Sequence, residues 1–169
     1  DTPRPINEYG VSKLLGDNEV LSESQGGLVI RVAWLTGVYG HNYVKAIINR
    51  AKQSKQLKVV DDQVGTPSFC SDVVEKTWAL INNNSEGLFN ICSKDACNRM
   101  EFTQEILRYL NLNEDVNIEA VKTSSFASLA NRPLNTALSL EKIHNEINTI
   151  TKDWKSLLHQ YLKNLNIEG

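Results

Sequence analysis

The 169-residue chain has an ordinary composition for a globular protein, with 41% hydrophobic and 22% charged residues. Its formal net charge of −2 gives no reason to expect a nucleic acid or an anionic membrane as a partner. No apolar run approaches the length of a membrane span. The length suits one sizeable core, or part of a larger domain joined to a small second lobe.

The three cysteines are Cys70, Cys92 and Cys97, an odd number without the paired Cys-x-x-Cys spacing of a zinc site. We therefore expect free thiols, a reducing cytoplasmic location and no bound metal.

The first part of the chain predicts a helix, a strand and a second helix. Residues 8–24 carry apolar positions at helical spacing, with Asn7 as a favoured N-cap and a glycine pair at the end. Residues 28–34 (LVIRVAW) form a near-continuous apolar run, which is typical of a parallel strand buried on both faces. After a turn at 36–40, the second helix places four apolar residues on one stripe: Val44, Ile47, Ile48 and Ala51.

The same alternation continues through the middle of the chain. A short strand at 57–60 leads into a loop at 61–68 (DDQVGTPS), and Ser71 is the expected cap of the next helix. Another short strand is expected at 88–92. Helices that alternate with strands favour an α/β layer structure.

The last third predicts more helix than strand. Asn98 and Glu101 have capping-box spacing at the start of a helix, and residues 116–120 alternate like a half-exposed strand. Residues 122–138 are expected to be irregular, and two helices follow. The final helix has an amphipathic stripe that must pack on another element: Trp154, Leu157, Leu158, Tyr161, Leu162 and Leu165.

Tyr9 and Lys13 are four residues apart in the first predicted helix, so their side chains share one face. An ammonium one turn from a phenol favours the phenolate, which makes the pair a candidate proton donor to a developing alkoxide. The alternative is a surface tyrosine that precedes a lysine by chance, because the chain has five tyrosines and many lysines. The spacing by itself leaves both interpretations open.

The sequence around this pair and several motifs after it resemble one enzyme family. Residues 5–16 (PINEYGVSKLLG) are similar to the extended short-chain dehydrogenase/reductases, which act on nucleotide sugars. Further motifs stand at 31–34 (RVAW), 37–40 (GVYG), 62–67 (DQVGTP) and 130–133 (ANRP). Their order and separation resemble the dTDP-4-dehydrorhamnose reductase family over nearly the whole chain. Two departures are Ser68, where that family usually has threonine, and the helix near Met100, which lacks the family's usual aromatic residue at its start.

The resemblance implies an α/β fold: the C-terminal part of a doubly wound, Rossmann-type parallel sheet domain, joined to a small α+β substrate-binding lobe. It assigns residues 1–56 and 69–93 to the sheet domain, and 57–68 and 94–169 to the lobe. The chain contains no Gly-x-Gly-x-x-Gly fingerprint for a dinucleotide, and Tyr9 lies near its start. We therefore expect a fragment of a longer protein, which alone binds no NADPH, is inactive and is either poorly stable or self-associating.

The resemblance also implies a reaction. This is the reduction of the C4 keto group of dTDP-4-dehydro-6-deoxy-L-mannose to dTDP-L-rhamnose, with NADPH or NADH as cofactor. Tyr9 would protonate the keto oxygen, and Lys13 would hydrogen-bond the nicotinamide ribose, so both residues are expected to be catalytic and cofactor-binding. Trp34, Asn42 and Arg132 are expected to bind the dTDP-sugar. A homodimer is compatible with the resemblance.

Each of the three substrate-binding residues has a structural alternative. Trp34 can be a core aromatic that closes the sheet, Asn42 can cap its helix, and Arg132 can form an intramolecular ion pair. Two other functions also stay open. One is a non-catalytic binding module similar to the regulatory subunit of methionine adenosyltransferase, and the other is an epimerase or dehydratase of another nucleotide sugar.

Overall fold

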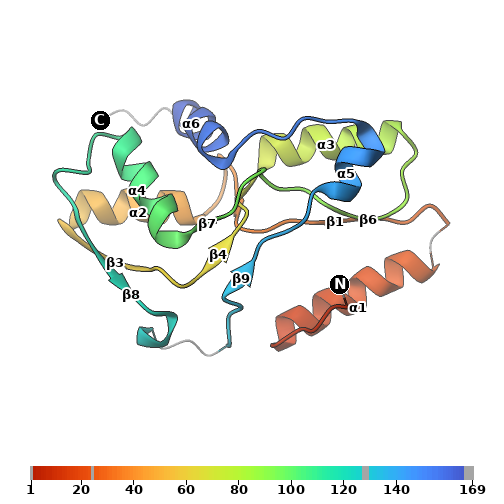
Figure 1. The fold of residues 1–169 in the computed structure, drawn as a ribbon, viewed down its shortest axis with the longest axis horizontal. Helices are drawn as coiled ribbons and strands as arrows, with labels where there is room; N and C mark the ends of the chain where they lie inside the picture. The colour runs from red at the N-terminus through yellow and green to blue at the C-terminus, as the bar shows by residue number, and fades with distance from the viewer. Residues whose placement is uncertain (1, 24, 127–129, 166–169) are drawn as a thin grey trace.

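The computed structural model describes residues 2–23, 25–126 and 130–165, so the expectations for residues 24, 127–129 and 166–169 lie outside the described part. Figure 1 shows the helices and strands in space. In chain order they are α1 (Glu8–Glu23), β1 (Leu28–Arg31), β2 (Leu35–Thr36), α2 (Tyr43–Gln53), β3 (Gln56–Val60), β4 (Val64–Gly65), β5 (Ser68–Phe69), α3 (Cys70–Asn82), β6 (Gly87–Asn90), β7 (Cys97–Asn98), α4 (Arg99–Tyr109), β8 (Asn117–Val121), the 3₁₀ helix η1 (Thr123–Ser125), β9 (Asn135–Thr136), α5 (Glu141–Ile147) and α6 (Trp154–Asn164).

Most strand pairs are parallel and are formed by segments far apart in the sequence. β1 pairs with β6, β2 with β5 and β3 with β8, all in parallel. β4 lies between antiparallel β7 and parallel β9. Parallel strands need crossover connections, and helices supply most of them here. The mixed α/β class is therefore confirmed, while a continuous doubly wound sheet stays a prediction.

The strand predicted at 28–34 is wrong in its second half. β1 ends at Arg31, and Trp34 has a φ of 49°, in the left-handed region that interrupts an extended strand. The chain resumes as the two-residue strand β2, and Thr36 Oγ1 donates to the Trp34 carbonyl at 3.2 Å. The apolar run predicted a strand correctly, but only Val29 of β1 is buried, so burial on both faces is wrong, and the run carried no signal for the turn inside it.

Two of the predicted helix starts have opposite outcomes. The capping box of α4 is confirmed, because Asn98 Oδ1 accepts from the Glu101 N–H at 2.8 Å and Glu101 Oε2 accepts from the Asn98 N–H at 2.9 Å. Ser71 does not cap α3: the helix begins one residue earlier, and Phe69 is its N-cap without a side-chain hydrogen bond. Strand β5 runs directly into this helix and leaves no room for a capping loop.

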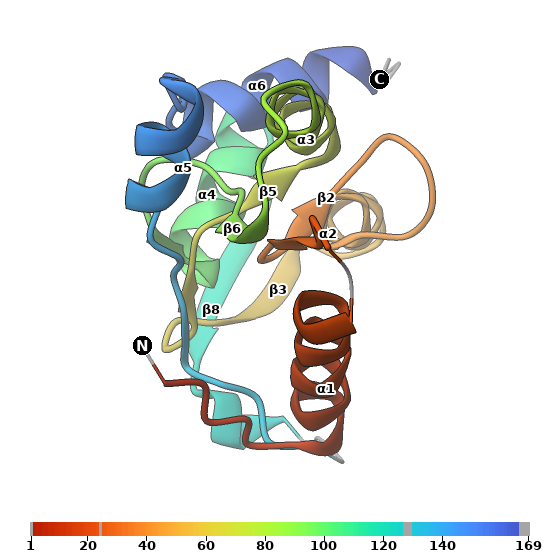
Figure 2. The ribbon, with the colours of Figure 1, turned by 90° about the vertical axis from the view of Figure 1, so that its right-hand side faces the viewer.

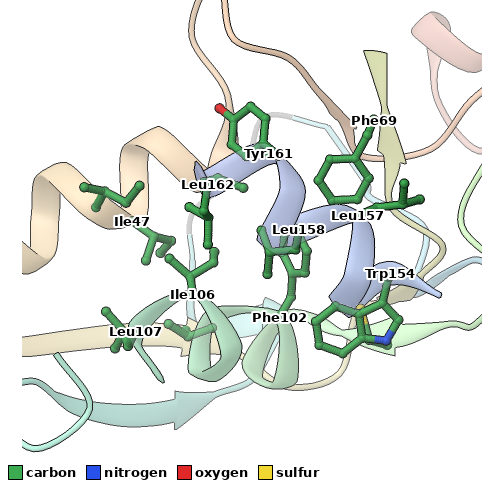
Figure 3. Packing of buried hydrophobic residues seen from close by; sticks show 14 of the residues in the cluster. Ile47, Phe69, Phe102, Ile106, Leu107, Trp154, Leu157, Leu158, Tyr161 and Leu162 are labelled. Carbon is green, nitrogen blue, oxygen red and sulfur yellow. The ribbon is translucent and has the colours of Figure 1, made fainter. Parts of the chain in front are cut away.

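The larger core lies between α2, α4, α6 and β3. Figure 3 shows the stripe of α6 packed against α4, with Phe102, Ile106 and Leu107 on the α4 side. Phe102 and Trp154 meet edge to face, with ring centroids 5.7 Å apart. The amphipathic stripe predicted for the last helix therefore packs against α4.

A smaller core joins α3, β6 and α5. Its fully buried members include Leu80, Phe89 and Ile143. α2, which the sequence grouped with the sheet domain, places its buried side chains in the larger core with α4 and α6, because its apolar stripe faces those helices. The division of the chain into a sheet domain and a lobe stays a prediction. None of the described helices combines the length and apolar character needed to cross a membrane.

Candidate functional site

Tyr9 and Lys13 lie on the exposed surface of α1, one turn apart. The Lys13 ammonium is 5.5 Å from the centroid of the Tyr9 ring, and the Tyr9 side chain is 72% exposed. Among the described residues, neither side chain makes a hydrogen bond or an ion pair that would occupy its polar atom. The spacing in the sequence therefore brings the two groups together, and both are available to a ligand.

α1 is held at its first turn by Asn7. Its Oδ1 accepts from the Gly10 N–H at 2.8 Å, which confirms the predicted N-cap, while its Nδ2 donates to the Asn131 carbonyl at 2.7 Å. The segment before α1 and the chain ahead of β9 run side by side at this point (Figure 2). One side chain therefore links the helix of Tyr9 to the residue directly before Arg132.

A cleft of about 310 Å³ lies between α2, β3 and the chain around η1. Three arginines and a lysine line it, and none of the described aspartates or glutamates does. The lining residues are Tyr43, Ile47, Arg50, Lys58, Val59, Val60, Gln63, Arg99, Thr123, Phe126 and Arg132. Lys58 lies 3.6 Å from Glu119. Within the described part of the chain, Arg50, Arg99 and Arg132 form no ion pair. This cleft therefore favours an anionic ligand.

The carboxylates closest to this cleft in sequence already have partners. Asp62 accepts from the Thr123 hydroxyl at 2.6 Å and from its backbone N–H at 3.0 Å, and these hydrogen bonds hold the pKa of the carboxyl below its ordinary value. Asp61 pairs with Lys122 at 2.9 Å. Neither acid neutralises an arginine of the cleft.

Arg99 was not predicted from the sequence. It is the first residue of α4, and its backbone N–H donates to the Gln63 carbonyl at 3.1 Å. Its guanidinium carbon lies 3.6 Å from the centroid of the Trp34 ring and 4.3 Å from that of Tyr43. One sequence signal could have pointed to Arg99. The helix that starts near Met100 departs from the dTDP-4-dehydrorhamnose reductase family, because it lacks the aromatic residue usual at its start and has an arginine before Met100.

The three residues expected to bind substrate are not gathered in one place. Arg132 lines the cleft. It forms no ion pair with a described carboxylate, although the sequence left an intramolecular ion pair open as an alternative for this residue. Asn42 caps α2: its Oδ1 accepts from the Lys45 N–H, and its Nδ2 donates to the Gly37 carbonyl and to the Tyr161 hydroxyl. Those contacts favour the capping role for Asn42.

Trp34 is half-buried and lies behind the cleft rather than in its lining. One face of the indole is covered by the Arg99 guanidinium, and Phe102 packs at a centroid distance of 6.1 Å. A sugar stacking on that face would have to displace Arg99. The predicted contact between Trp34 and a sugar stays a prediction.

A larger cavity of about 460 Å³ lies elsewhere, between α4 and α6. Its lining includes Glu101 and Glu105 as well as Arg108 and Lys155. Glu101 belongs to the capping box and Glu105 pairs with Arg108, so both acids of this lining are engaged in the fold. That mixed lining gives a phosphate-bearing ligand no advantage over the arginine cleft.

These features define a mixed α/β protein with an exposed Tyr–Lys pair and a cleft lined by arginines. A family model, the RmlD substrate binding domain, matches residues 1–167. The chain belongs to that family.

Relatives with known names agree with this assignment. The chain is 28% identical to the spore coat polysaccharide biosynthesis protein SpsK of Bacillus subtilis over 94% of the chain and 55% of that protein. It is 26% identical to the dTDP-4-dehydrorhamnose reductase of Shigella flexneri over 98% of the chain and 58% of that protein. The chain thus spans little more than half the length of these relatives.

Solved structures match the fold closely. The dTDP-4-dehydrorhamnose reductase from Bacillus anthracis, solved in complex with NADP, has a TM-score of 0.92 at 29% identity, over 97% of this chain and 58% of that one. The Clostridium acetobutylicum dTDP-4-dehydrorhamnose reductase has a TM-score of 0.91 at 32% identity, over 99% of this chain and 59% of that one.

Proposed function

We propose that the protein containing this chain reduces the C4 keto group of dTDP-4-dehydro-6-deoxy-L-mannose and forms dTDP-L-rhamnose. The observation that carries the proposal is the arginine cleft, which lies in a member of a substrate-binding family and is linked through Asn7 to the helix of Tyr9. Because the chain spans about 58% of comparable reductases, the reaction belongs to the whole protein. We include a cytoplasmic location in the proposal, because the three cysteines are free thiols.

The diphosphate is the part of the substrate that suits the cleft. Its phosphates carry negative charge, and arginine presents a planar fork of donors that matches phosphate oxygens. Arg50 and Arg132 are exposed at the cleft, and neither is neutralised by a described carboxylate. A dTDP-sugar bound there meets cations without first breaking an internal ion pair.

Tyr9 suits the reacting end of the substrate. Its hydroxyl is exposed and free of hydrogen bonds to the described residues, so it can donate a proton to the developing C4 alkoxide. The Lys13 ammonium lies one turn away, 5.5 Å from the centroid of the Tyr9 ring, and places a positive charge beside the phenol. Lys13 is also a free donor for a ribose hydroxyl of NADPH or NADH, and that cofactor supplies the hydride for C4.

The test uses the full-length protein with NADPH and the 4-keto sugar nucleotide. The expected result is stoichiometric loss of NADPH and formation of dTDP-L-rhamnose, followed by chromatography. A protein that binds dTDP but reduces no 4-keto sugar with either cofactor would be a binding module instead. An epimerised or dehydrated product without net loss of NADPH would favour the other enzymatic alternative.

A further inference from the structure

Arg99 is held in an unusual way for a residue that lines an open cleft. Trp34 and Tyr43 place their rings 3.6 and 4.3 Å from its guanidinium carbon, and its backbone is fixed at the start of α4 by the Gln63 carbonyl. Tyr43 is itself anchored, since its hydroxyl bonds the Thr103 hydroxyl at 2.7 Å. The guanidinium therefore has little freedom to turn away.

The same guanidinium lacks the partners that a buried cation normally has. Its Nη1 is buried and has no hydrogen-bond partner among the described residues, and no described carboxylate pairs with it. Burial lowers the pKa of Arg99 to about 10, with a smaller contribution from the like charge of Arg132, so the group is still protonated at neutral pH. The two aromatic faces offset part of the cost of a desolvated charge. A bound anion would offset the rest.

We propose that Arg99 binds a phosphate oxygen of the nucleotide diphosphate, and that Trp34 and Tyr43 are positioning residues that hold its guanidinium for this contact. The proposal deepens the proposed function and depends on it for the identity of the nucleotide. It also gives Trp34 a different role from the sugar contact implied by the family resemblance: Trp34 acts on the phosphate end of the ligand, through Arg99.

The rings of Trp34 and Tyr43 form a clamp on the Arg99 guanidinium, and preorganisation explains why such a clamp is useful. A free arginine loses rotamer freedom when it binds an anion, and this loss weakens the complex. Arg50 and Arg132 are exposed and still have that freedom, whereas Arg99 has lost it in the folded protein. Arg99 should therefore contribute more to diphosphate affinity than either exposed arginine.

The test separates the phosphate end of the ligand from the sugar end. Calorimetry on the full-length protein measures the affinities for dTDP, dTDP-L-rhamnose, inorganic pyrophosphate and uncharged thymidine. Arg99→Met should weaken dTDP and dTDP-L-rhamnose equally, by about 10- to 100-fold, the range for a lost charge-assisted hydrogen bond. Trp34→Ala should also weaken both equally, by about 2- to 30-fold, because it removes one face of the clamp.

Two further measurements distinguish positioning from a general loss of structure. The double variant Trp34→Ala/Arg99→Met should bind dTDP no more weakly than Arg99→Met alone, because Trp34 acts through Arg99. Trp34→Phe keeps a ring face and should restore much of the affinity. Should Trp34→Ala fail to fold, Tyr43→Leu removes the other ring that contacts the guanidinium, and Tyr43→Phe keeps that ring but loses the hydroxyl contact with Thr103.

Lys155→Met is the matched control, because Lys155 lies 5.5 Å from the ring of Trp154 outside the cleft. It should leave dTDP binding unchanged. The inference is overturned if Arg99→Met binds dTDP normally, or if Trp34→Ala weakens only dTDP-L-rhamnose. Pyrophosphate binding that depends on Arg99, in a protein without reductase activity, would leave this inference standing and refute the proposed function.

Discussion

Gly65 of β4 lies directly against the indole of Trp34. A Cβ added at position 65 would lie 2.6 Å from Cε2 and 2.9 Å from Cζ2 of that ring, closer than real side chains approach. Trp34 itself has a φ of 49°, which is rare for an aromatic residue and costs roughly 1–3 kcal/mol. The indole ring is therefore confined between the β4 backbone and Arg99. These contacts hold the Trp34 backbone in a left-handed conformation that it would not otherwise adopt.

Gly65→Ala should displace the indole, the β4 backbone or the Thr136 hydroxyl, whose oxygen also lies 2.6 Å from the added Cβ. We expect a loss of roughly 1–3 kcal/mol in the free energy of unfolding, the usual cost of overpacking, together with weaker dTDP binding. Urea unfolding and calorimetry measure the two effects. Gly16→Ala is the control, because a Cβ at that position in α1 meets no atom within 4 Å and should be neutral or slightly stabilising. A Gly65→Ala variant as stable as the unaltered protein would contradict the confinement of Trp34.

Tyr9→Phe tests the proton donor with little risk to the fold. The side chain is 72% exposed and α1 has no buried residue, so removal of one hydroxyl should leave stability and dTDP affinity nearly unchanged. Turnover of the full-length protein should fall by roughly 10²- to 10⁴-fold, the usual share of general acid catalysis. Single-turnover kinetics with the 4-keto substrate measure this. A rate near that of the unaltered protein would remove Tyr9 from the mechanism.

The elements predicted best are those fixed by local chemistry. The capping box at Asn98 and the stripe of α6 depend on spacing within one helix, and both are confirmed. The strand ending at Trp34 was predicted too long because its left-handed turn depends on contacts from β4 and α4, which are distant in sequence. Patterns within a segment carry no information about such contacts.

The candidate site shows the same division. Tyr9 and Lys13 were proposed from their spacing together with the resemblance of residues 5–16, and the helix does bring the two side chains onto one face. Arg132 was named from the resemblance of its motif. Arg99 was missed, since the role proposed for it depends on contacts with Trp34 and Tyr43, which come from two other segments of the chain.

Acid should destabilise the protein partly through Glu105. Its carboxylate is buried, accepts from Arg108 at 2.6 Å and also contacts His159; the hydrogen bonds from Arg108 are the main cause that lowers its pKa. A carboxyl with a lowered pKa in the folded state contributes stability above its unfolded value of about 4.3, and the contribution is lost as the pH falls through the folded value.

Glu105→Gln should therefore cost stability at neutral pH and make the unfolding free energy less dependent on pH below about 4.3. Urea unfolding at a series of pH values measures both effects. Glu119→Gln is the control, because Glu119 forms only an exposed pair with Lys58. Parallel pH profiles for the unaltered protein and Glu105→Gln would show that Glu105 does not contribute.

Asn7 has two separable roles, and one substitution distinguishes them. Its Oδ1 caps α1, while its Nδ2 holds the Asn131 carbonyl and so fixes the approach to Arg132. Asn7→Ser keeps an oxygen for the cap, because serine is as good an N-cap as asparagine, but it removes the amide donor. Asn7→Ala removes both and should also lower stability by about 1 kcal/mol.

We therefore expect Asn7→Ser to unfold at nearly the same temperature as the unaltered full-length protein and to bind dTDP-L-rhamnose about 2- to 10-fold more weakly, as for one lost exposed hydrogen bond. The reason is that the chain before Arg132 would lose its tie to α1, and the guanidinium its fixed position relative to Tyr9. The effect should disappear when Arg132 is already replaced by methionine, because Asn7 would act through that residue. Calorimetry on the two single variants and the double variant measures this coupling. Additive losses would mean that Asn7 influences the ligand by some route other than Arg132.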